Sequence, residues 1–148
     1  MKNAADLAQA CAEKMWAQDN ASQGLGMAIR DIAPGHAVVT MQVQSSMVNG
    51  LGLCHGGFIF TLADSTFAFA CNTHNEMNVA QHCAVTFLRP ARLGDTMIAE
   101  ATERTREGRS GIYDVCVRAL NGDTIAEFRG HSRTIGQKFF PKHGENTP

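Results

Sequence analysis

The chain of 148 residues is 44% hydrophobic and 18% charged, with a formal net charge of -1. This size and apolar content suit a single domain over residues 1–148 with a sizeable core, and they argue against a second domain. The nearly neutral charge balance argues against DNA or RNA binding, which normally requires a sustained basic surface.

The sequence carries no sign of export or membrane insertion. The N-terminus lacks the apolar core of a signal peptide, and no stretch approaches the roughly 20 apolar residues that a membrane span needs. We therefore expect a soluble cytoplasmic protein without a membrane partner. The cysteines are odd in number and form no Cys-x-x-Cys pair, which argues against disulfides and structural zinc and favours reduced, mostly buried thiols. They are Cys11, Cys54, Cys71, Cys83 and Cys116.

The first expected elements are a helix and a hairpin. Apolar residues at helical spacing predict an amphipathic helix over 4–20, within an N-terminal helical segment 1–22. Alternation of apolar and polar residues then predicts strands over 25–33 and 36–44. Pro34-Gly35 joins these two strands as a hairpin.

A loop over 45–53 precedes the longest apolar helix of the chain, which is expected from 56 to about 72. Asp64 is the only formally charged residue between His55 and Glu76. A helix that is hydrophobic nearly all round is a buried helix, so we expect this one in the core with a sheet wrapped around it.

The rest of the chain has strand composition. The Asn121-Gly122 pair is a strong signal for a two-residue hairpin, and the polar tail 137–148, with its two prolines, is expected to fray. The order of elements predicts an α+β protein in which an antiparallel sheet surrounds one long central helix. The four expected strands are 79–88, 96–106, 110–120 and 124–135.

Five short motifs carry a family resemblance: Asn49-Gly50, Cys54-His55-Gly56-Gly57, Leu62-Ala63-Asp64, Phe87-Leu88-Arg89-Pro90 and Gly94-Asp95-Thr96. They resemble the hotdog-fold acyl-CoA thioesterases, most closely the phenylacetate-degradation (PaaI) type, over about 25–135. The resemblance implies the hotdog fold and hydrolysis of an aryl-acetyl-CoA or related acyl-CoA to free acid and coenzyme A, in phenylacetate catabolism. It implies homodimers with shared active sites, often paired into homotetramers. No cofactor is expected, because coenzyme A is part of the substrate.

Thioester hydrolysis needs a donor for the developing oxyanion, and Gly56 and Gly57 fit that role. The first N–H groups of a helix have no intrahelical partner, the helix dipole favours negative charge there, and glycine lets a carbonyl oxygen approach closely. A tight turn into the helix would need only one glycine, so the pair favours the functional interpretation.

Asp64 fits the second requirement, a carboxylate that activates water or attacks the carbonyl directly. Partly apolar surroundings would make it a stronger base than a solvated carboxylate, and a capping or interface aspartate is the alternative interpretation. Asp64 lies seven positions after Gly57, which is roughly 10 Å along a helix, so one chain cannot bring both groups to one carbonyl. If both act, Asp64 of one subunit meets the glycine amides of another across a two-fold interface.

The resemblance gives supporting roles to three polar residues. Asn49 matches a residue that positions water or the thioester region, although a plain Asn-Gly turn explains it nearly as well. His55 would fix the loop or assist the carbonyl, and a helix-capping role is an equal alternative. His82 matches the position where some relatives carry a hydroxyl residue that faces the aspartate. A buried, hydrogen-bonded core histidine is the stronger interpretation of His82.

Further substrate contacts are expected from arginines and from the buried helix. Arg89 and the stretch Arg109-Ser110-Gly111, which resembles a family segment near the nucleotide, are candidates for contacts to coenzyme A. Each arginine taken singly also suits a solvated surface. Phe58, Phe67 and Phe69 are candidates for the acyl pocket and are equally plausible as ordinary core.

Other interpretations stay open. A hydratase on the same fold would use His55 and Asp64 to exchange protons with an enoyl thioester, and a non-catalytic module would bind acyl-CoA without turnover. Cys54 is weakly supported as a nucleophile, because no third orienting group is indicated. A metal site is equally weak, because its candidate ligands have no recognised zinc spacing; they are Cys71, His74, His82 and Cys83.

Overall fold

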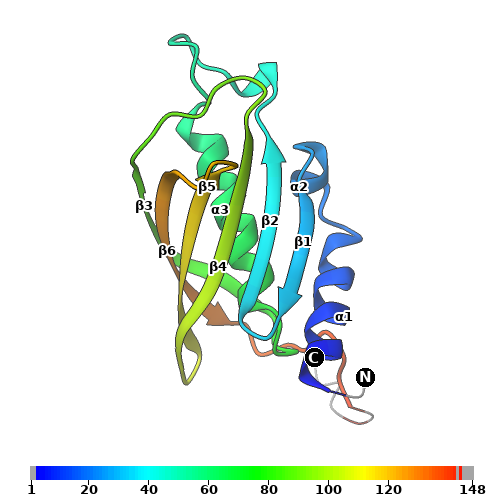
Figure 1. Cartoon of the computed structure of the whole chain (residues 1–148). Helices are drawn as coiled ribbons and strands as arrows, with labels where there is room; N and C mark the ends of the chain where they lie inside the picture. The colour runs from blue at the N-terminus through cyan, green and yellow to red at the C-terminus, as the bar shows by residue number, and fades with distance from the viewer. Residues whose placement is uncertain (1–2, 143, 145–148) are drawn as a thin grey trace.

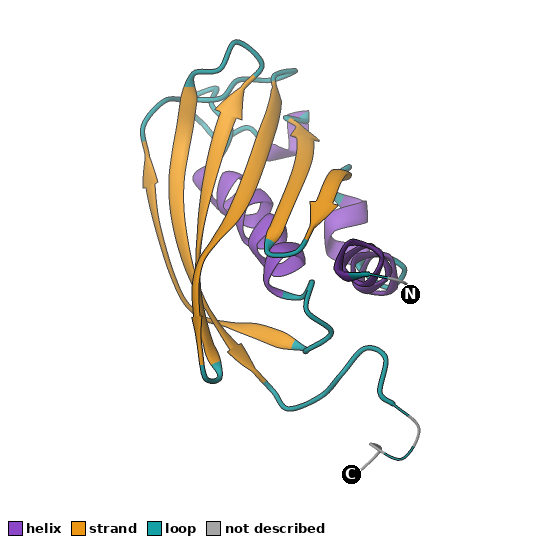
Figure 2. Ribbon diagram, turned by 60° about the horizontal axis from the view of Figure 1, so that its bottom comes forward, coloured by secondary structure: helices purple, strands orange, loops and turns teal. Residues whose placement is uncertain are grey.

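A computed structural model describes residues 3–142 and 144, and in it a six-stranded antiparallel sheet wraps around one helix (Figures 1 and 2). The strand order is β1-β2-β4-β5-β6-β3. This is the α+β arrangement that the sequence predicts. The elements are α1 (Ala4–Trp16), α2 (Asn20–Gly24), β1 (Ala28–Ala33), β2 (His36–Gln42), η1 (Ser45–Met47), α3 (Gly56–Cys71), β3 (Asn78–Phe87), β4 (Thr96–Glu107), β5 (Ser110–Ala119) and β6 (Thr124–Thr134).

The central helix α3 packs against the inner face of the sheet, as expected from its hydrophobic surface. Phe67 is 1% exposed and its ring contacts Tyr113 and Phe128 at centroid distances of 5.6 and 5.9 Å. Gly130 of β6 makes room for this ring, because a Cβ there would lie 2.8 Å from it. The buried threonine Thr66 satisfies its hydroxyl within the helix by donating to the carbonyl of Leu62 at 2.7 Å. No helix among the described residues is long and apolar enough to cross a membrane.

The N-terminal region differs from the single helix predicted over 4–20. α1 ends at Trp16, and a second short helix, α2, begins at Asn20. The side chain of Asp19 caps α2 by accepting from the N–H of Ser22 at 2.9 Å. Ser22 is buried, and its hydroxyl lies 2.9 Å from that of Ser65 on α3. The Asp19 cap and the Ser22 contact begin a second helix at a point where the apolar spacing alone predicts that the first helix continues.

The C-terminal segment is anchored, so the expectation that it frays is wrong for residues 137–140. The side chain of Asn75 pairs with the backbone of Phe140, accepting from its N–H at 2.8 Å and donating to its carbonyl at 3.0 Å. Lys14 of α1 donates to the carbonyl of Phe139 at 2.6 Å, and Phe139 is buried. Residues 143 and 145–148 of the predicted tail lie outside the described residues.

Side chains close the C-terminal end of α3. Asn72 donates to the carbonyl of Ala68 at 2.9 Å and accepts from the N–H of Asn78 at 2.7 Å. The Asn78 side chain donates to the carbonyl of Cys71 at 3.1 Å. These bonds give partners to carbonyl groups that a helix end otherwise leaves free.

A polar cluster on β4 and β5 supports this same end. Glu103 accepts from the hydroxyl of Tyr113 at 2.8 Å and from Nε2 of His74 at 2.9 Å. Burial and the neighbouring carboxylate raise the pKa of Tyr113, which keeps its hydroxyl protonated as a donor. The end of α3 is thus tied to the sheet through polar groups that are each satisfied.

The two edges of the sheet differ. α1 lies along the β1 edge, whereas β3 forms the other edge and pairs only with β6 (Figure 1). Most residues of β3 are exposed, and Val79 and Phe87 near its two ends are about half exposed. Among the described residues, β3 is therefore an edge strand with free backbone groups on one side.

Candidate active site

The start of α3 is built by His55, which serves as its N-cap in extended backbone conformation. The ring Nδ1 of His55 accepts from the N–H of Gly57 at 2.8 Å. Of the two interpretations of this histidine, the structure therefore confirms the helix cap. The loop before it is held in place because the N–H of His55 donates to the carbonyl of Met47 at 2.7 Å.

The two adjacent glycines are not equivalent. The N–H of Gly57 is occupied by His55, so the expectation that Gly57 supplies a free donor is wrong for this conformation. The N–H of Gly56, the first residue of α3, has no hydrogen-bond partner among the described residues. Because the positive end of the helix dipole lies at the same point, Gly56 is a better candidate than Gly57 for an oxyanion donor.

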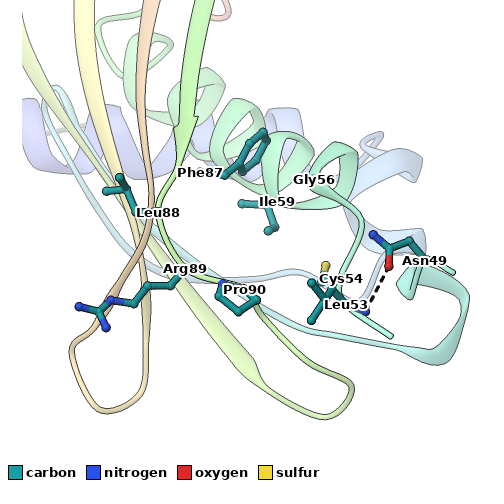
Figure 3. Close-up of a pocket in the computed structure, with 9 residues that line it drawn as sticks. All are labelled: Asn49, Leu53, Cys54, Gly56, Ile59, Phe87, Leu88, Arg89 and Pro90. Carbon is teal, nitrogen blue, oxygen red and sulfur yellow. Dashed lines mark hydrogen bonds between the residues drawn. The ribbon is translucent and has the colours of Figure 1, made fainter. Parts of the chain in front are cut away.

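Gly56 lines an open cleft of about 410 Å³, shown in Figure 3. Such a volume falls in the range of small-molecule sites, and most of the lining side chains are apolar. Arg89 stands at its edge, where its guanidinium lies 3.6 Å from the carboxylate of Asp123. The lining residues are Asn49, Leu53, Cys54, Gly56, Ile59, Phe87, Leu88, Arg89 and Pro90.

Asn49 forms the turn that shapes one side of this cleft. Its side-chain oxygen accepts from the N–H groups of Leu51 and Leu53 at 2.9 and 3.2 Å, and the second bond is drawn in Figure 3. The Asn-Gly turn interpretation is therefore confirmed. The side-chain nitrogen of Asn49 makes no hydrogen bond to a described residue, so it is available to a molecule in the cleft.

The aromatic wall of the cleft is Phe87, which sequence reasoning did not assign to the acyl pocket. A Cβ on Gly56 would lie 3.0 Å from the Phe87 ring, so only glycine fits there without displacement. Of the two interpretations of Phe67 and Phe69, the structure supports ordinary core, because Phe67 packs against Tyr113 and Phe69 packs on Trp16 at 6.2 Å. Phe58 is half-buried beside the His55 ring and does not line the cleft.

Asp64 lies on α3 about 12 Å beyond Gly56, counted as eight residues of helical rise, and it does not line the cleft. Its carboxylate is half-buried, and burial raises its pKa. The partner that offsets part of this effect is Cys83 of β3, whose Sγ lies 3.9 Å from Oδ1. A carboxylate in such surroundings is a stronger base than one in water.

Cys83, and not His82, faces the aspartate. A register irregularity between Ala80 and His82 interrupts the alternation of β3, and side chains of neighbouring strand residues point to opposite faces. His82 is exposed, with its ring 5.2 Å from that of His131, so the expectation of a buried core histidine is wrong. Its predicted role as a substrate contact is not supported by any contact to Asp64.

The stretch Arg109-Ser110-Gly111 lies at the other end of α3. Arg109 and Ser110, together with His74 and Arg106, line a small polar cavity beside the helix terminus, and Gly111 does not line it. Within one chain, these residues are therefore separated from the cleft at Gly56 by the length of the helix. Among the described residues, no group of three or more histidine, cysteine or acidic side chains is placed to hold a metal ion.

Comparisons with known proteins place the chain in a family. The sequence profile described as the thioesterase superfamily matches residues 51–126. The acyl-coenzyme A thioesterase PaaI of Escherichia coli is 42% identical over 125 residues, which are 84% of this chain and 89% of that protein. The chain belongs to the thioesterase superfamily. Human acyl-coenzyme A thioesterase 13 is 34% identical over 109 residues, which are 70% of this chain and 76% of that protein.

The fold of this superfamily member agrees with solved structures. The structure of the Escherichia coli PaaI protein, from the phenylacetic acid degradation operon, superposes with a TM-score of 0.90 at 40% identity. It covers 92% of this chain, and 99% of that chain is matched. The hotdog fold predicted from the sequence is therefore confirmed.

In this thioesterase-superfamily chain the predicted site residues form two groups and two isolated positions. One group surrounds the start of α3 and the other its end, while Asp64 lies between them and His82 on the outer face. Phe87, Ile59 and Leu53 at the cleft and Cys83 beside Asp64 were missed. The Phe-Leu-Arg-Pro motif was the available signal for Phe87, because proline ends a strand and places the preceding residues at its rim.

Proposed function

We propose that the protein is an acyl-CoA thioesterase that hydrolyses the thioester to free acid and coenzyme A. The observation that carries this proposal is the separation of a hydrogen-bond donor and a carboxylate along α3. The N–H of Gly56 has no hydrogen-bond partner among the described residues and lies in a cleft that none of their carboxylates lines, and the half-buried carboxylate of Asp64 lies outside that cleft. Hydrolysis of a thioester needs both groups, one for each side of the carbonyl.

The N–H of Gly56 polarises the thioester carbonyl and stabilises the oxyanion that forms in the transition state. The helix dipole adds a favourable field at the same point, and the absence of a Cβ lets the oxygen come close. The free side-chain nitrogen of Asn49 at the rim of the cleft orients the thioester or the attacking water. His55 contributes indirectly, by holding the Gly57 amide and so the geometry of the first turn.

Asp64 acts as general base toward water or as nucleophile toward the carbonyl carbon. Burial raises its pKa, so its ionised form binds a proton more readily than an exposed aspartate does. Because about 12 Å separates Asp64 from Gly56 along one helix, the Asp64 that serves a given cleft comes from a second subunit.

The assembly that this requires is a two-fold homodimer, and dimers pair into a homotetramer. The exposed edge of β3 supports it, because an unprotected edge strand is suited to pairing with another chain. Asp64 faces this same strand through Cys83. With two antiparallel copies of α3, Arg109 at the end of one helix approaches the cleft at the start of the other.

The substrate is an aryl-acetyl-CoA or related acyl-CoA, and no further cofactor takes part. The apolar lining from Leu53, Ile59 and Phe87 suits a hydrophobic acyl group. Arg89 at the cleft and Arg109 from the partner are suited to the phosphates of coenzyme A. The names of the relatives, a phenylacetic acid degradation protein among them, support this substrate class. A cytoplasmic role in phenylacetate catabolism is part of the same proposal.

Thiol release tests the proposal. The protein is assayed against phenylacetyl, hydroxyphenylacetyl, benzoyl and straight-chain CoA esters, and Asp64→Asn is compared with Asp114→Asn. We expect Asp64→Asn to lose about 10² to 10⁴ in kcat, the usual contribution of a positioned base. Asp114 pairs with Arg129 on the outer face of the sheet, so its substitution should leave kcat within twofold of the unsubstituted protein.

Three outcomes contradict the proposal. Normal hydrolysis by Asp64→Asn would remove the assigned base. Hydration of an enoyl-CoA without release of thiol would favour the hydratase. Tight binding of the panel without any turnover would favour a non-catalytic binding module.

A further inference from the structure

We propose that Cys83 is a positioning residue for Asp64, which holds one oxygen of the carboxylate through its thiol. The proposal rests on the proposed function, because it assigns a role at the same site. Cys83 does not touch the reacting atoms and acts through Asp64 alone.

The geometry supports this assignment. Cys83 is half-buried on β3, packs against the core, and directs Sγ at Oδ1 of Asp64 at 3.9 Å. A carboxylate can only accept, so the thiol is the donor. Among the described residues no other side chain makes a hydrogen bond to Asp64, so this contact is what restrains the rotation of the carboxylate. No hydrogen bond from a described residue reaches Oδ2, which in the proposed mechanism faces water or substrate.

The thiol is suited to donate and not to attack. Burial raises the pKa of Cys83, and the neighbouring Asp64 charge raises it further, so the thiol keeps its proton. The second titratable group coupled to this pair is Cys71 on α3, where burial raises the pKa to about 12. Both thiols are therefore neutral in the range where Asp64 titrates, so neither adds a charge beside its carboxylate.

The register of β3 is what makes this possible. The irregularity between Ala80 and His82 places Cys83 on the inner face, opposite the helix, and sends His82 to the outer face. A residue one position earlier or later would point away from Asp64. Position 83 is thus the one on this strand whose side chain reaches the carboxylate.

The test compares Cys83→Ala with Cys83→Ser. Both variants lose the volume of the sulfur, and they differ by one hydroxyl donor. We expect kcat of Cys83→Ala to fall about three- to tenfold, the usual effect of one hydrogen bond, with KM within twofold. Cys83→Ser should keep kcat within about twofold, because its hydroxyl is a stronger donor than a thiol.

A pH profile separates positioning from packing. The bond stabilises the ionised carboxylate, so its loss raises the pKa of Asp64. Since the base form is the active form, the rising limb of kcat should move to higher pH by a few tenths of a unit in Cys83→Ala. In Cys83→Ser the limb should stay in place or move to lower pH.

Cys116→Ala is the matched control, because Cys116 of β5 lies beside Glu127 of β6, away from Asp64. It should change neither kcat nor the profile. Equal kcat and equal pH midpoints in Cys83→Ala and Cys83→Ser would overturn the proposal, and so would unchanged behaviour of Cys83→Ala. The result for Asp64→Asn distinguishes a failure of the proposed function from a failure of the role assigned to Cys83. If that variant is inactive while Cys83→Ala is normal, the proposed function stands and the role of Cys83 fails.

Discussion

The two ends of α3 are treated in opposite ways. At the C-terminal end, Asn72 and Asn78 give partners to helix carbonyls, and Glu103 gathers two donors from the neighbouring elements. At the N-terminal end, one amide is capped by His55 while that of Gly56 has no partner among the described residues and lies in an open apolar cleft. The same helix therefore has one closed end and one open end.

This difference indicates where stability and where function reside. A buried polar group without a hydrogen-bond partner costs free energy, and the C-terminal end of α3 shows that side chains can supply such partners. The open N-terminal end therefore calls for a functional explanation. Under the proposed function, a substrate oxygen is the hydrogen-bond partner of the open end. Substitutions at the open end should therefore affect turnover, and substitutions at the closed end should affect the free energy of unfolding.

Of the two helix ends, the open end should show the larger effect, from Gly56→Ala. The new Cβ would meet the Phe87 ring at 3.0 Å and displace either the ring or the bound carbonyl. A displacement on the order of 1 Å at the reacting centre costs about 100-fold in kcat. Gly50→Ala is the control, because a Cβ there meets nothing within 4 Å. A Gly56→Ala enzyme with normal kcat would show that the open end is not the oxyanion site.

The closed end should respond in the opposite manner to Asn72→Ala. Asn72 is 3% exposed and its side chain has partners on both the helix and β3. Its loss should lower the free energy of unfolding by about 2 kcal/mol, as measured by urea denaturation, with kcat within twofold at a temperature where the variant is folded. Asn121→Ala, in the exposed turn between β5 and β6, should have little effect on either quantity. A catalytic defect without a loss of stability would break the comparison.

The smallest effect concerns the middle of the helix, where Asp64→Asn should raise the melting temperature by a few degrees at pH 7. Burial raises the pKa of Asp64 in the folded chain, so the folded state binds the proton more tightly than the unfolded state. The ionised carboxylate therefore lowers stability at neutral pH, and this loss is recovered as the pH falls through the folded pKa. Calorimetry at pH 7 and at about pH 4, near the unfolded pKa, should show the gain shrinking. An unchanged or lower melting temperature at pH 7 would show that Asp64 is structural.

Local signals were sufficient for most of the fold. The apolar run with one carboxylate predicted α3, and alternation with Gly and Pro boundaries predicted the strands. They failed where a distant residue decides the local structure. The break between α1 and α2 depends on the contact between Ser22 and Ser65, and the anchored C-terminal segment depends on Asn75, 65 residues before Phe140.

The candidate site was predicted in its parts and less well in its details. Gly56 and Asp64 became candidates because their residue types are unusual for their positions, and Asn49 became one through the family resemblance. The choice between Gly56 and Gly57 depends on the ring of His55, which a sequence does not orient. Cys83 faces Asp64 in place of the predicted His82 because β3 contains a register irregularity. A shift of one residue along a strand reverses which side chain faces the helix.

The contact between Phe67 and Gly130 links two positions that are 63 residues apart. The aromatic ring occupies the space that a side chain on β6 would fill, so neither position can be enlarged by itself. Substitutions at positions 67 and 130 should therefore be correlated among homologues. A homologue with alanine or serine in place of the glycine is expected to carry a smaller residue than phenylalanine opposite it, and Gly130→Ala combined with Phe67→Leu should be less damaging than Gly130→Ala alone.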